Sequence, residues 1–352
     1  MFINGRFLTR PATGVDRFAT ELLRGAPASL TQAFTLALPA GAAARALDLP
    51  AAIGVRHLGR RAGQAWEQWD LPRGIGDRPL VNLCNSAPLM QRNQLVVLHD
   101  AATLANPGNF SLAFRHWYRL MLTALWRKAR AIATVSAFSA DELRRLLGPR
   151  RGPLEVIPES GEHIRHVAAD DRIIDRLGLS GQPFVLAVGS QSPNKNLAGV
   201  VAALGHLDDP RLRLVAAGGA NSRVFNQASD DDARLIRTGY ISDGELRALY
   251  EHAACFVFPS YYEGFGLPPL EAMNCGCPVI VSDRTSLPEV CGDAALYCDP
   301  DDPVGIARQI RRVLDEPRLR EDLRAAGLQR AAGFTWAAAG QQFAGVLGQH
   351  LA

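Results

Sequence analysis

Residues 255–283 read CFVFPSYYEGFGLPPLEAMNCGCPVIVSD, and this stretch decides the fold class. It begins and ends with short apolar runs, at residues 255–260 and 278–283, and a glycine turn and a helical segment lie between them. Continuous apolar runs, unlike alternating ones, are typical of strands buried on both faces of a parallel sheet. The stretch therefore predicts one strand–helix–strand unit of such a sheet.

The same alternation of strands and helices extends through the whole chain and predicts an α/β fold with two Rossmann-like, doubly wound domains. We expect an N-terminal domain at residues 1–160, a C-terminal domain at residues 161–335, and a helix at residues 336–352 that packs back on the N-terminal domain. Ligands of such sheets bind beyond the carboxyl ends of the strands, so we expect a cleft between the domains. Further strands are expected at residues 34–38, 80–83, 95–100, 131–136, 154–158, 184–189 and 213–219.

The composition is that of a globular protein, because 47% of the 352 residues are hydrophobic and 21% are charged. No apolar run approaches the roughly 18 residues that span a bilayer. The first residues also do not resemble a signal peptide, so we expect a cytoplasmic protein. Six cysteines in a chain of this length predict buried thiols and not a disulfide framework or a metal site.

Charge is unevenly distributed along the sequence. Residues 1–160 hold 20 arginines and lysines against 11 acidic residues, whereas the remainder holds 18 against 24. A basic first half indicates an acidic partner, such as a phosphorylated ligand or an anionic membrane surface. A solvated surface in an arginine-rich chain explains the excess equally well. Nucleic acid is not among the partners that we expect.

The turn at residues 261–267 has the features of an anion site at the start of a helix. Gly264 and Gly266 permit positive φ and a close approach of the backbone to a ligand. The free N–H groups of the helix start attract phosphate. Glu271, expected in the first helical turn, would be kept ionised there and would accept from vicinal hydroxyls of a sugar or ribose. A turn with a capping acid is the plain structural alternative.

The segment EGFGLPPLEAMNCGCPVIVSD at residues 263–283 resembles the E-x7-E signature of retaining glycosyltransferases of family 4, which have the GT-B fold. The similarity runs from NGRFLTRPATGVDRFA near the start to FTWAAAGQQFAGVL near the end. The resemblance implies that Glu263 contacts hydroxyls of the donor sugar at the reaction centre and that Glu271 binds the nucleotide ribose. It also implies that sugar and diphosphate are held by the backbone amides of Gly264, Phe265, Gly266 and Leu267.

A second loop, VLAVGSQSPNKNL at residues 185–197, contains one of the only two lysines in the chain. Lys195, with Asn194 beside it, is well placed to bind a diphosphate and to neutralise the charge on the leaving group. The family often has an arginine soon after the strand glycine, and here that position is Ser190. An arginine from the other domain, such as Arg17, could replace it. A surface lysine is the alternative reading.

Three further positions gain a role mainly from the resemblance. His99 follows an N-domain strand, and the resemblance implies that it reaches the donor sugar. Asp100 would orient the loop or the ring. Without the resemblance, a lone histidine is more often structural than catalytic. Gly14, at the start of a helix, would approach the phosphates. Tyr240 and Ile241, in TGYISDGEL at residues 238–246, would border the nucleobase, although Asp243 as a helix cap explains the polar part of this segment equally well.

Residues 110–131, FSLAFRHWYRLMLTALWRKARA, mix aromatic, leucine and basic residues. A basic amphipathic helix can lie on an anionic membrane, which would place the protein peripherally at the inner face of the cytoplasmic membrane. Phe114, Trp117 and Met121 recur at helical spacing, and such residues are more often core.

These observations predict transfer of a hexose, with mannose weakly preferred, from a nucleotide sugar to a hydroxyl of a saccharide or lipid-linked acceptor in polysaccharide synthesis. His99, Lys195 and Glu263 are the predicted catalytic residues. No cofactor or metal is expected, because Asp230, Asp231 and Asp232 lie in a polar connector away from the glycine turn. A GT-B epimerase and a non-catalytic nucleotide-sugar-binding subunit remain as alternatives; a phosphorylase would need a dedicated lysine for pyridoxal phosphate, and Lys195 already has a role.

Overall fold

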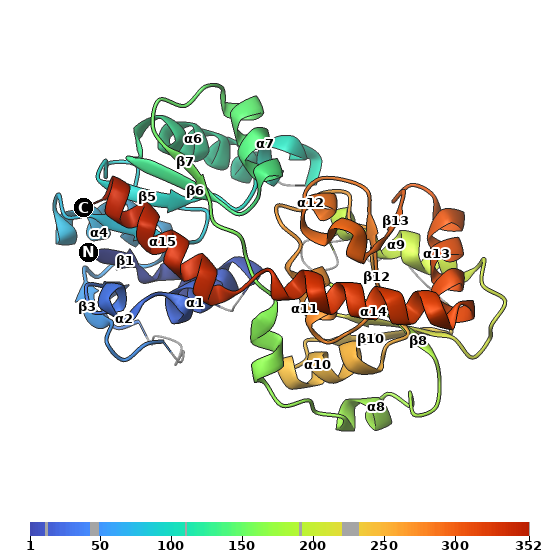
Figure 1. Ribbon diagram of the computed structural model, residues 1–352. Coiled ribbons are helices and arrows are strands. Elements are labelled where there is room, and N and C mark those ends of the chain that lie inside the picture. The colour runs from blue at the N-terminus through green and yellow to red at the C-terminus, as the bar shows by residue number, and fades with distance from the viewer. Residues whose placement is uncertain (11–12, 43–48, 110, 190–191, 220–231, 352) are drawn as a thin grey trace. The chain divides into compact units, whose positions relative to one another are not determined.

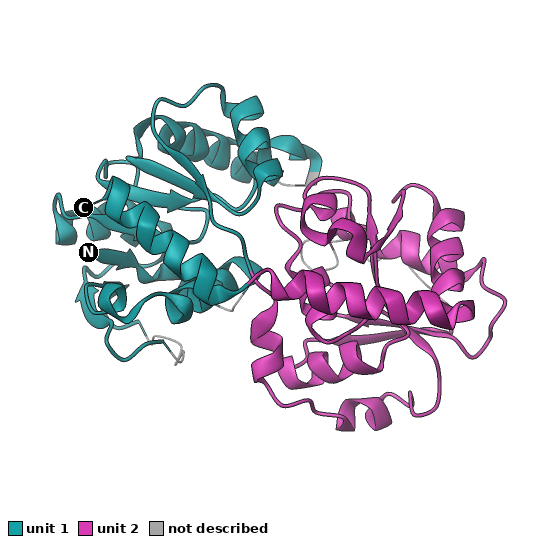
Figure 2. Ribbon diagram, in the orientation of Figure 1, with its two compact units in different colours: residues 1–159, 335–352 teal, residues 160–334 magenta. Residues whose placement is uncertain are grey.

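A computed structural model describes residues 1–352 except 11–12, 43–48, 110, 190–191, 220–231 and 352 (Figure 1). The described chain divides into two compact units, which Figure 2 colours separately. Unit 1 comprises Met1–Glu159 and Thr335–Ala352, and unit 2 comprises Ser160–Phe334. Each unit contains one parallel sheet, as the continuous apolar runs predicted.

The sheet of unit 1 has the strand order β3-β2-β1-β4-β5-β6-β7 in the described residues, and every neighbouring pair is parallel. Its central strands are buried on both faces, whereas the edge strand β3 is largely exposed. The strands are β1 (Phe2–Asn4), β2 (Thr35–Pro39), β3 (Gly54–Leu58), β4 (Leu80–Asn82), β5 (Gln94–Val97), β6 (Ala131–Thr134) and β7 (Leu154–Val156).

Helices cover both faces of this sheet and form two apolar clusters. Met121, Leu125 and Trp126 of α6 pack with Leu143 of α7 on strands β5 and β6. Trp66 and its neighbours cover β1, β2 and β4. The helical segments are η1 (Gly5–Thr9), α1 (Gly14–Gly25), α2 (Ala28–Thr31), α3 (Gly63–Ala65), the π-helix η2 (Trp66–Asp70), α4 (Leu71–Ile75), α5 (Ala102–Ala105), η3 (Pro107–Asn109), α6 (Leu112–Lys128), α7 (Ala137–Leu147) and α15 (Trp336–His350).

The C-terminal helix α15 packs lengthwise on α1, although the two are far apart in sequence (Figure 1). The contact is backbone to backbone, because a Cβ added at Gly340 would lie 2.2 Å from the carbonyl oxygen of Gly25. Phe343 is fully buried against Phe34, with 6.2 Å between the ring centroids. The chain therefore starts in unit 1, builds unit 2, and returns to unit 1 for its last helix.

The sheet of unit 2 has the order β10-β9-β8-β11-β12-β13 and is also parallel throughout its described strands. Helices α9 and α13 cover one face, and α11 and α14 pack on each other. The elements are η4 (Glu162–His166), α8 (Arg172–Arg176), β8 (Phe184–Val188), η5 (Pro193–Lys195), α9 (Leu197–Leu204), β9 (Arg213–Ala217), β10 (Leu235–Gly239), α10 (Asp243–His252), β11 (Cys255–Phe258), α11 (Leu267–Asn274), β12 (Val279–Ser282), α12 (Leu287–Cys291), η6 (Gly292–Ala294), β13 (Leu296–Cys298), α13 (Pro303–Asp315) and α14 (Pro317–Ala332).

Within the described part of the chain, no helix combines the length and apolarity that crossing a bilayer requires. All six cysteines are free, and Cys255, Cys277, Cys291 and Cys298 are buried. Burial raises the pKa of the Cys255 thiol to about 12, so this thiol stays protonated at neutral pH.

Candidate active site

The loop between β11 and α11 is fixed by side chains that follow it in sequence. The hydroxyl of Ser286 donates to the carbonyl oxygens of Phe265, at 2.7 Å, and Glu263, at 3.1 Å. Gly266, the residue before the helix, has φ 118°, and a Cβ there would lie 2.8 Å from the side chain of Leu287. Only glycine fits this position. The loop therefore has one defined conformation at the carboxyl end of a central strand.

Helix α11 starts at Leu267, and the next two residues are Pro268 and Pro269. Proline has no N–H, so it suits the first helical turn, where backbone amides have no partner within the helix. The unsatisfied amides of this helix start are therefore concentrated around Gly266 and Leu267, within the stretch that the sequence predicts to hold a diphosphate.

Lys195 and Glu263 come together, as their loops follow neighbouring strands of the sheet. The Lys195 Nζ lies 2.6 Å from Glu263 Oε1 and 5.0 Å from the centroid of the Phe258 ring. Backbone contacts join the same two loops, since the amide of Tyr261 donates to the carbonyl oxygen of Asn194 at 2.8 Å. The lysine and glutamate side chains keep 24% and 12% of their surface exposed, so a ligand can reach the pair.

A recess beside this pair is lined by the carboxyl ends of β8, β9 and β11, and both Lys195 and Arg237 face it. Arg237 lies on the edge strand β10, which the sequence did not predict, and so its position in this recess was missed. Ser190, where the family's arginine is absent, lies outside the described residues, as do Asp230 and Asp231; the adjacent Asp232 pairs with Arg234 at 2.8 Å. Arg237 is thus a second cation, besides Lys195, among the described residues that line this recess.

Glu271 is the fifth residue of α11, one turn deeper in the helix than the sequence suggested. It is 7% exposed, and its two carboxylate oxygens already have partners. His163 Nε2 lies 2.9 Å from Oε1, and the hydroxyl of Tyr250 donates to Oε2 at 3.2 Å. Burial and the charge of Glu271 raise the pKa of Tyr250 well above its ordinary value, so this hydroxyl remains a donor. Neither His163 nor Tyr250 was predicted.

His99 uses both ring nitrogens inside unit 1 and is 4% exposed. Nε2 lies 2.9 Å from the carbonyl oxygen of Leu83, and Nδ1 lies 3.1 Å from Glu159 Oε1. The Leu83 carbonyl accepts from Nε2, and an ionised Glu159 accepts from Nδ1, so this environment favours the protonated form of the ring. Burial alone would lower the pKa of His99, but the hydrogen bond and charge of Glu159, with the Leu83 carbonyl, raise it above its ordinary value.

We predict a pH dependence of stability from this pair. A histidine whose pKa is higher in the folded state stabilises the fold below its unfolded value of 6.5, and this contribution is lost as pH rises through the folded pKa. Glu159→Gln should lower the pKa of His99 and flatten the pH dependence. Urea denaturation at about pH 6 and about pH 9, with an NMR titration of the ring, measures both effects. An unchanged His99 pKa in the variant would contradict the assignment.

The remaining predicted residues occupy loops or helix starts. Gly14 is the first residue of α1, and a Cβ added there would meet nothing within 4 Å, so the helix start is open. Asp100 accepts from the amide of Ala102 at 2.9 Å and orients its own loop. Tyr240 is 86% exposed, with its ring against the backbone of Gly219, and Ile241 is half-buried. The cap of α10 is Ser242, in a capping box with Glu245, and not Asp243.

The structure thus brings Asn194, Lys195, Glu263 and the 264–267 turn together at the carboxyl ends of the central strands of the unit 2 sheet. Gly14, His99 and Asp100 lie in unit 1, as does the alternative cation Arg17. Signals for the missed residues were weak, because Arg237 is on a partly exposed edge strand and His163 is in a five-residue 3-10 segment.

Residues 170–330 match the family described as glycosyl transferases group 1. The O-antigen chain mannosyltransferase B of Escherichia coli is 38% identical over 219 residues, which cover 59% of this chain and 58% of that protein. The chain thus spans less than two thirds of this curated relative.

Solved structures share the architecture over nearly the whole chain. Sucrose-phosphate synthase from Thermosynechococcus elongatus superposes with a TM-score of 0.76 at 20% identity, covering 99% of this chain and 98% of that one. Anabaena Alr3699/HepE in complex with UDP-glucose superposes with a TM-score of 0.77 at 17% identity and the same coverage. The fold is GT-B, as predicted. The family match at residues 170–330 lies within unit 2 and includes the E-x7-E segment, so it supports the resemblance to glycosyltransferases of family 4.

Proposed function

We propose that this protein transfers a hexose, mannose by preference, from a nucleoside diphosphate sugar to a hydroxyl of a saccharide or lipid-linked acceptor in cell-surface polysaccharide synthesis, with retention of configuration and without a metal. The observation that supports this most is the contact between Lys195 and Glu263. This contact supports the proposal because a cation and a carboxylate lie directly beside each other at the carboxyl ends of the strands, where parallel α/β folds bind ligands.

Each residue has a defined part in the proposed reaction. Lys195 stabilises the negative charge that develops on the departing nucleoside diphosphate, and the amides around Gly266 and Leu267 bind its phosphates. Glu263 accepts hydrogen bonds from the sugar hydroxyls. Glu271 is proposed to bind the ribose, since a carboxylate has about four acceptor sites and the two known contacts leave room for more.

The bond between the anomeric carbon and the phosphate oxygen breaks, and a bond from that carbon to the acceptor oxygen forms on the same face. The acceptor proton passes to a phosphate oxygen of the leaving group, as the family resemblance implies, so no protein base is needed. His99 can contact the sugar only if one ring nitrogen exchanges its partner, because Leu83 and Glu159 use both. We therefore propose that it acts first as a charged positioning residue of its loop.

The mannose preference derives from the similarity to O-antigen mannosyltransferase B, whereas the HepE structure contains UDP-glucose. A thermal-shift screen across nucleotide sugars tests the donor, since a ligand at 100 times its Kd stabilises by about 2.7 kcal/mol. We expect the largest shift with GDP-mannose. NMR of the product formed with a saccharide acceptor should then show the donor's anomeric configuration. Binding of a donor with neither transfer nor hydrolysis would instead indicate a non-catalytic binding subunit.

We propose that Arg237 is the second diphosphate cation, in the place of the arginine that position 190 lacks. Arg237→Gln should weaken binding of a nucleoside diphosphate by about 10- to 100-fold, the value of one charge-assisted hydrogen bond. Calorimetry with GDP measures the change, and Arg308→Gln, an exposed arginine on α13, is the control. Equal affinities of parent and Arg237 variant would show that the guanidinium does not contact the nucleotide.

Contact with an anionic membrane is proposed for the exposed side of α6. Met121 is buried in the core, as the alternative interpretation of this helix predicted. Leu112, Phe114 and Leu120, in contrast, are 67%, 39% and 57% exposed. Apolar side chains that alternate with arginines can insert at a lipid headgroup boundary. Such contact would bring the enzyme to a lipid-linked acceptor.

A further inference from the structure

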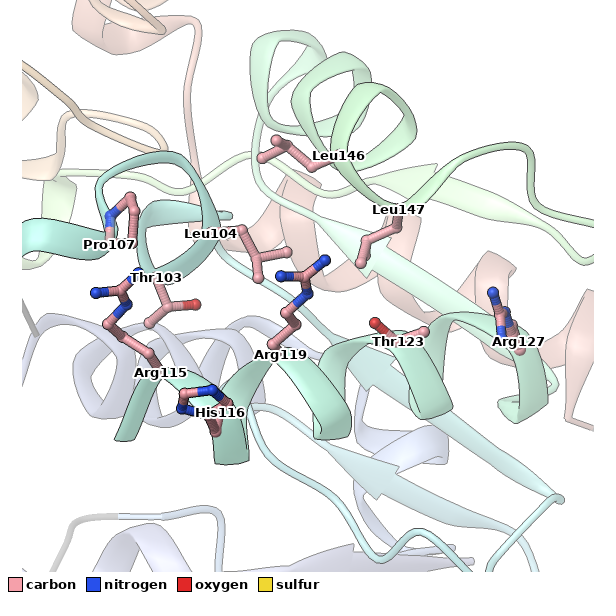
Figure 3. A pocket seen from close by; sticks show the side chains of 10 residues that line it. All are labelled: Thr103, Leu104, Pro107, Arg115, His116, Arg119, Thr123, Arg127, Leu146 and Leu147. Carbon is pink, nitrogen blue, oxygen red and sulfur yellow. The ribbon is translucent and has the colours of Figure 1, made fainter. Parts of the chain in front are cut away.

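A groove of about 520 Å³ lies in unit 1, between α6 and the segments that carry Leu104, Pro107 and Leu147 (Figure 3). Its size is within the range of small-molecule sites, which is roughly 300–1,000 Å³. All of its lining residues belong to unit 1, and none of them is a residue to which a catalytic or donor-binding role is assigned above.

One wall of the groove is a row of basic side chains. Arg115, Arg119 and Arg127 of α6 all line the groove, and Figure 3 shows Arg119 rising toward Leu104 and Leu147 with the other two arginines on either side of it. None of the described lining residues is Asp or Glu, and none of the three arginines has a carboxylate within ion-pair distance in the described chain. The positive charge of this wall is uncompensated.

Among the described residues, the arginines of the neighbouring helix α7, unlike those of the groove wall, have acidic partners. On α7, Arg144 pairs with Asp141 at 2.8 Å and Arg145 pairs with Glu142 at 2.6 Å. Arg127 is in the last turn of α6, where a cation is favoured by the helix dipole, but Arg115 is near the start, where a cation is disfavoured. Like charges four residues apart, as in Arg115 and Arg119, also destabilise a helix. Helix stability therefore does not explain these two arginines.

The opposite wall is apolar. Leu104 of α5 and Leu146 and Leu147 at the end of α7 line the groove and are half-buried, so part of each side chain remains open to it. Guanidinium groups on one side match phosphate oxygens in a bidentate manner, and leucines on the other side match a hydrocarbon. A concave site of this kind suits a single amphiphilic molecule better than the flat surface of a bilayer.

We propose that this groove binds the phosphate end of a lipid phosphate, with Arg115 and Arg119 on the phosphate oxygens and the leucines on the first carbons of the chain. The assignment of this ligand as the acceptor of the sugar rests on the proposed function. The groove would then hold the anchored end of the acceptor in unit 1 and leave its saccharide end free to react.

The test compares inorganic phosphate with octyl phosphate by calorimetry. All proteins carry Lys195→Met and Arg237→Gln, so that both proposed cations of the donor site are removed and any residual phosphate binding there is the same in every comparison. We expect octyl phosphate to bind about tenfold or more tightly than phosphate, because part of its chain leaves water. The double variant Arg115→Gln/Arg119→Gln should bind both ligands about 100-fold more weakly, as loss of two charge-assisted hydrogen bonds predicts. The control Arg308→Gln/Arg318→Gln removes two exposed arginines of unit 2 and should bind as its parent does.

Several results would overturn the proposal. The first is equal affinity for phosphate and octyl phosphate, and the second is an equal loss of affinity in the control variant. The third is that neither ligand binds whereas phosphatidylglycerol vesicles bind in an arginine-dependent way, which would indicate a flat membrane contact. Thermal denaturation shows that the double variant is folded, and its midpoint should not fall, since it removes a repulsive pair. Binding to the groove is measured without a sugar donor and without turnover. Failure of the groove to bind a lipid phosphate can therefore be distinguished from failure of the protein to transfer sugar.

Discussion

Lys195→Met is expected to lower kcat by about 10²- to 10³-fold, the usual loss when one stabilising group of a developing anion is removed. Methionine retains most of the aliphatic part of the side chain, so the fold should be unaffected. The ammonium group is lost, together with its contact with Glu263, its position over the Phe258 ring and its charge near the leaving diphosphate. The affinity for the donor should fall less than kcat, because the charge on the diphosphate increases as the bond to the sugar breaks.

The measurement is a single-turnover assay with saturating donor, together with calorimetry for the nucleoside diphosphate. Lys128→Met is a matched control, since Lys128 is the only other lysine of the chain and is exposed at the end of α6. Glu263→Gln should also lower kcat more than affinity. A Lys195 variant that transfers sugar at the parent rate would remove Lys195 from the mechanism.

Glu271→Ala is expected to destabilise unit 2 by about 1–3 kcal/mol for each buried polar group that loses its acceptor. The alanine leaves His163 Nε2 and the hydroxyl of Tyr250 without their acceptor, and both side chains are buried. Loss of donor binding in this variant would therefore not identify a ribose contact. We therefore expect Glu271→Ala to be chiefly a stability variant.

Glu271→Gln separates the two effects, because the amide retains one oxygen acceptor and the shape of the side chain. It should remain folded at 25 °C and bind GDP about tenfold more weakly, if the carboxylate accepts from ribose hydroxyls. Urea denaturation and calorimetry provide both values, and Glu321→Ala, at an exposed position of α14, should change neither. Parent-like GDP affinity in Glu271→Gln would limit Glu271 to a structural role.

The strands that the sequence predicted are those with continuous apolar runs, such as β5, β6, β11 and β12, which the structure buries on both faces. The strands that it missed lack this signal. Strand β1 has only three residues, although it is central, and β3, β10 and β13 are edge strands with partly exposed residues. An apolar pattern reveals burial, and edge strands are only partly buried.

The glycine turn and the lysine loop could be predicted because each contains its own local signal at the end of a strand. The partners of the buried acids could not, because they are distant in sequence: His163 is 108 residues from Glu271, and Glu159 is 60 residues from His99. Of the groove in unit 1, the sequence showed only the basic helix. Its leucine wall comes from other segments, so its concave shape required the structure.

The most direct test of the account is a crystal structure of the protein with a non-transferable analogue of GDP-mannose. We predict that the diphosphate contacts Lys195 and the amides of Gly266 and Leu267, that the sugar hydroxyls contact Glu263, and that Arg237 reaches the nucleotide. An analogue bound elsewhere, with the Lys195–Glu263 ion pair intact and untouched, would contradict the central claim.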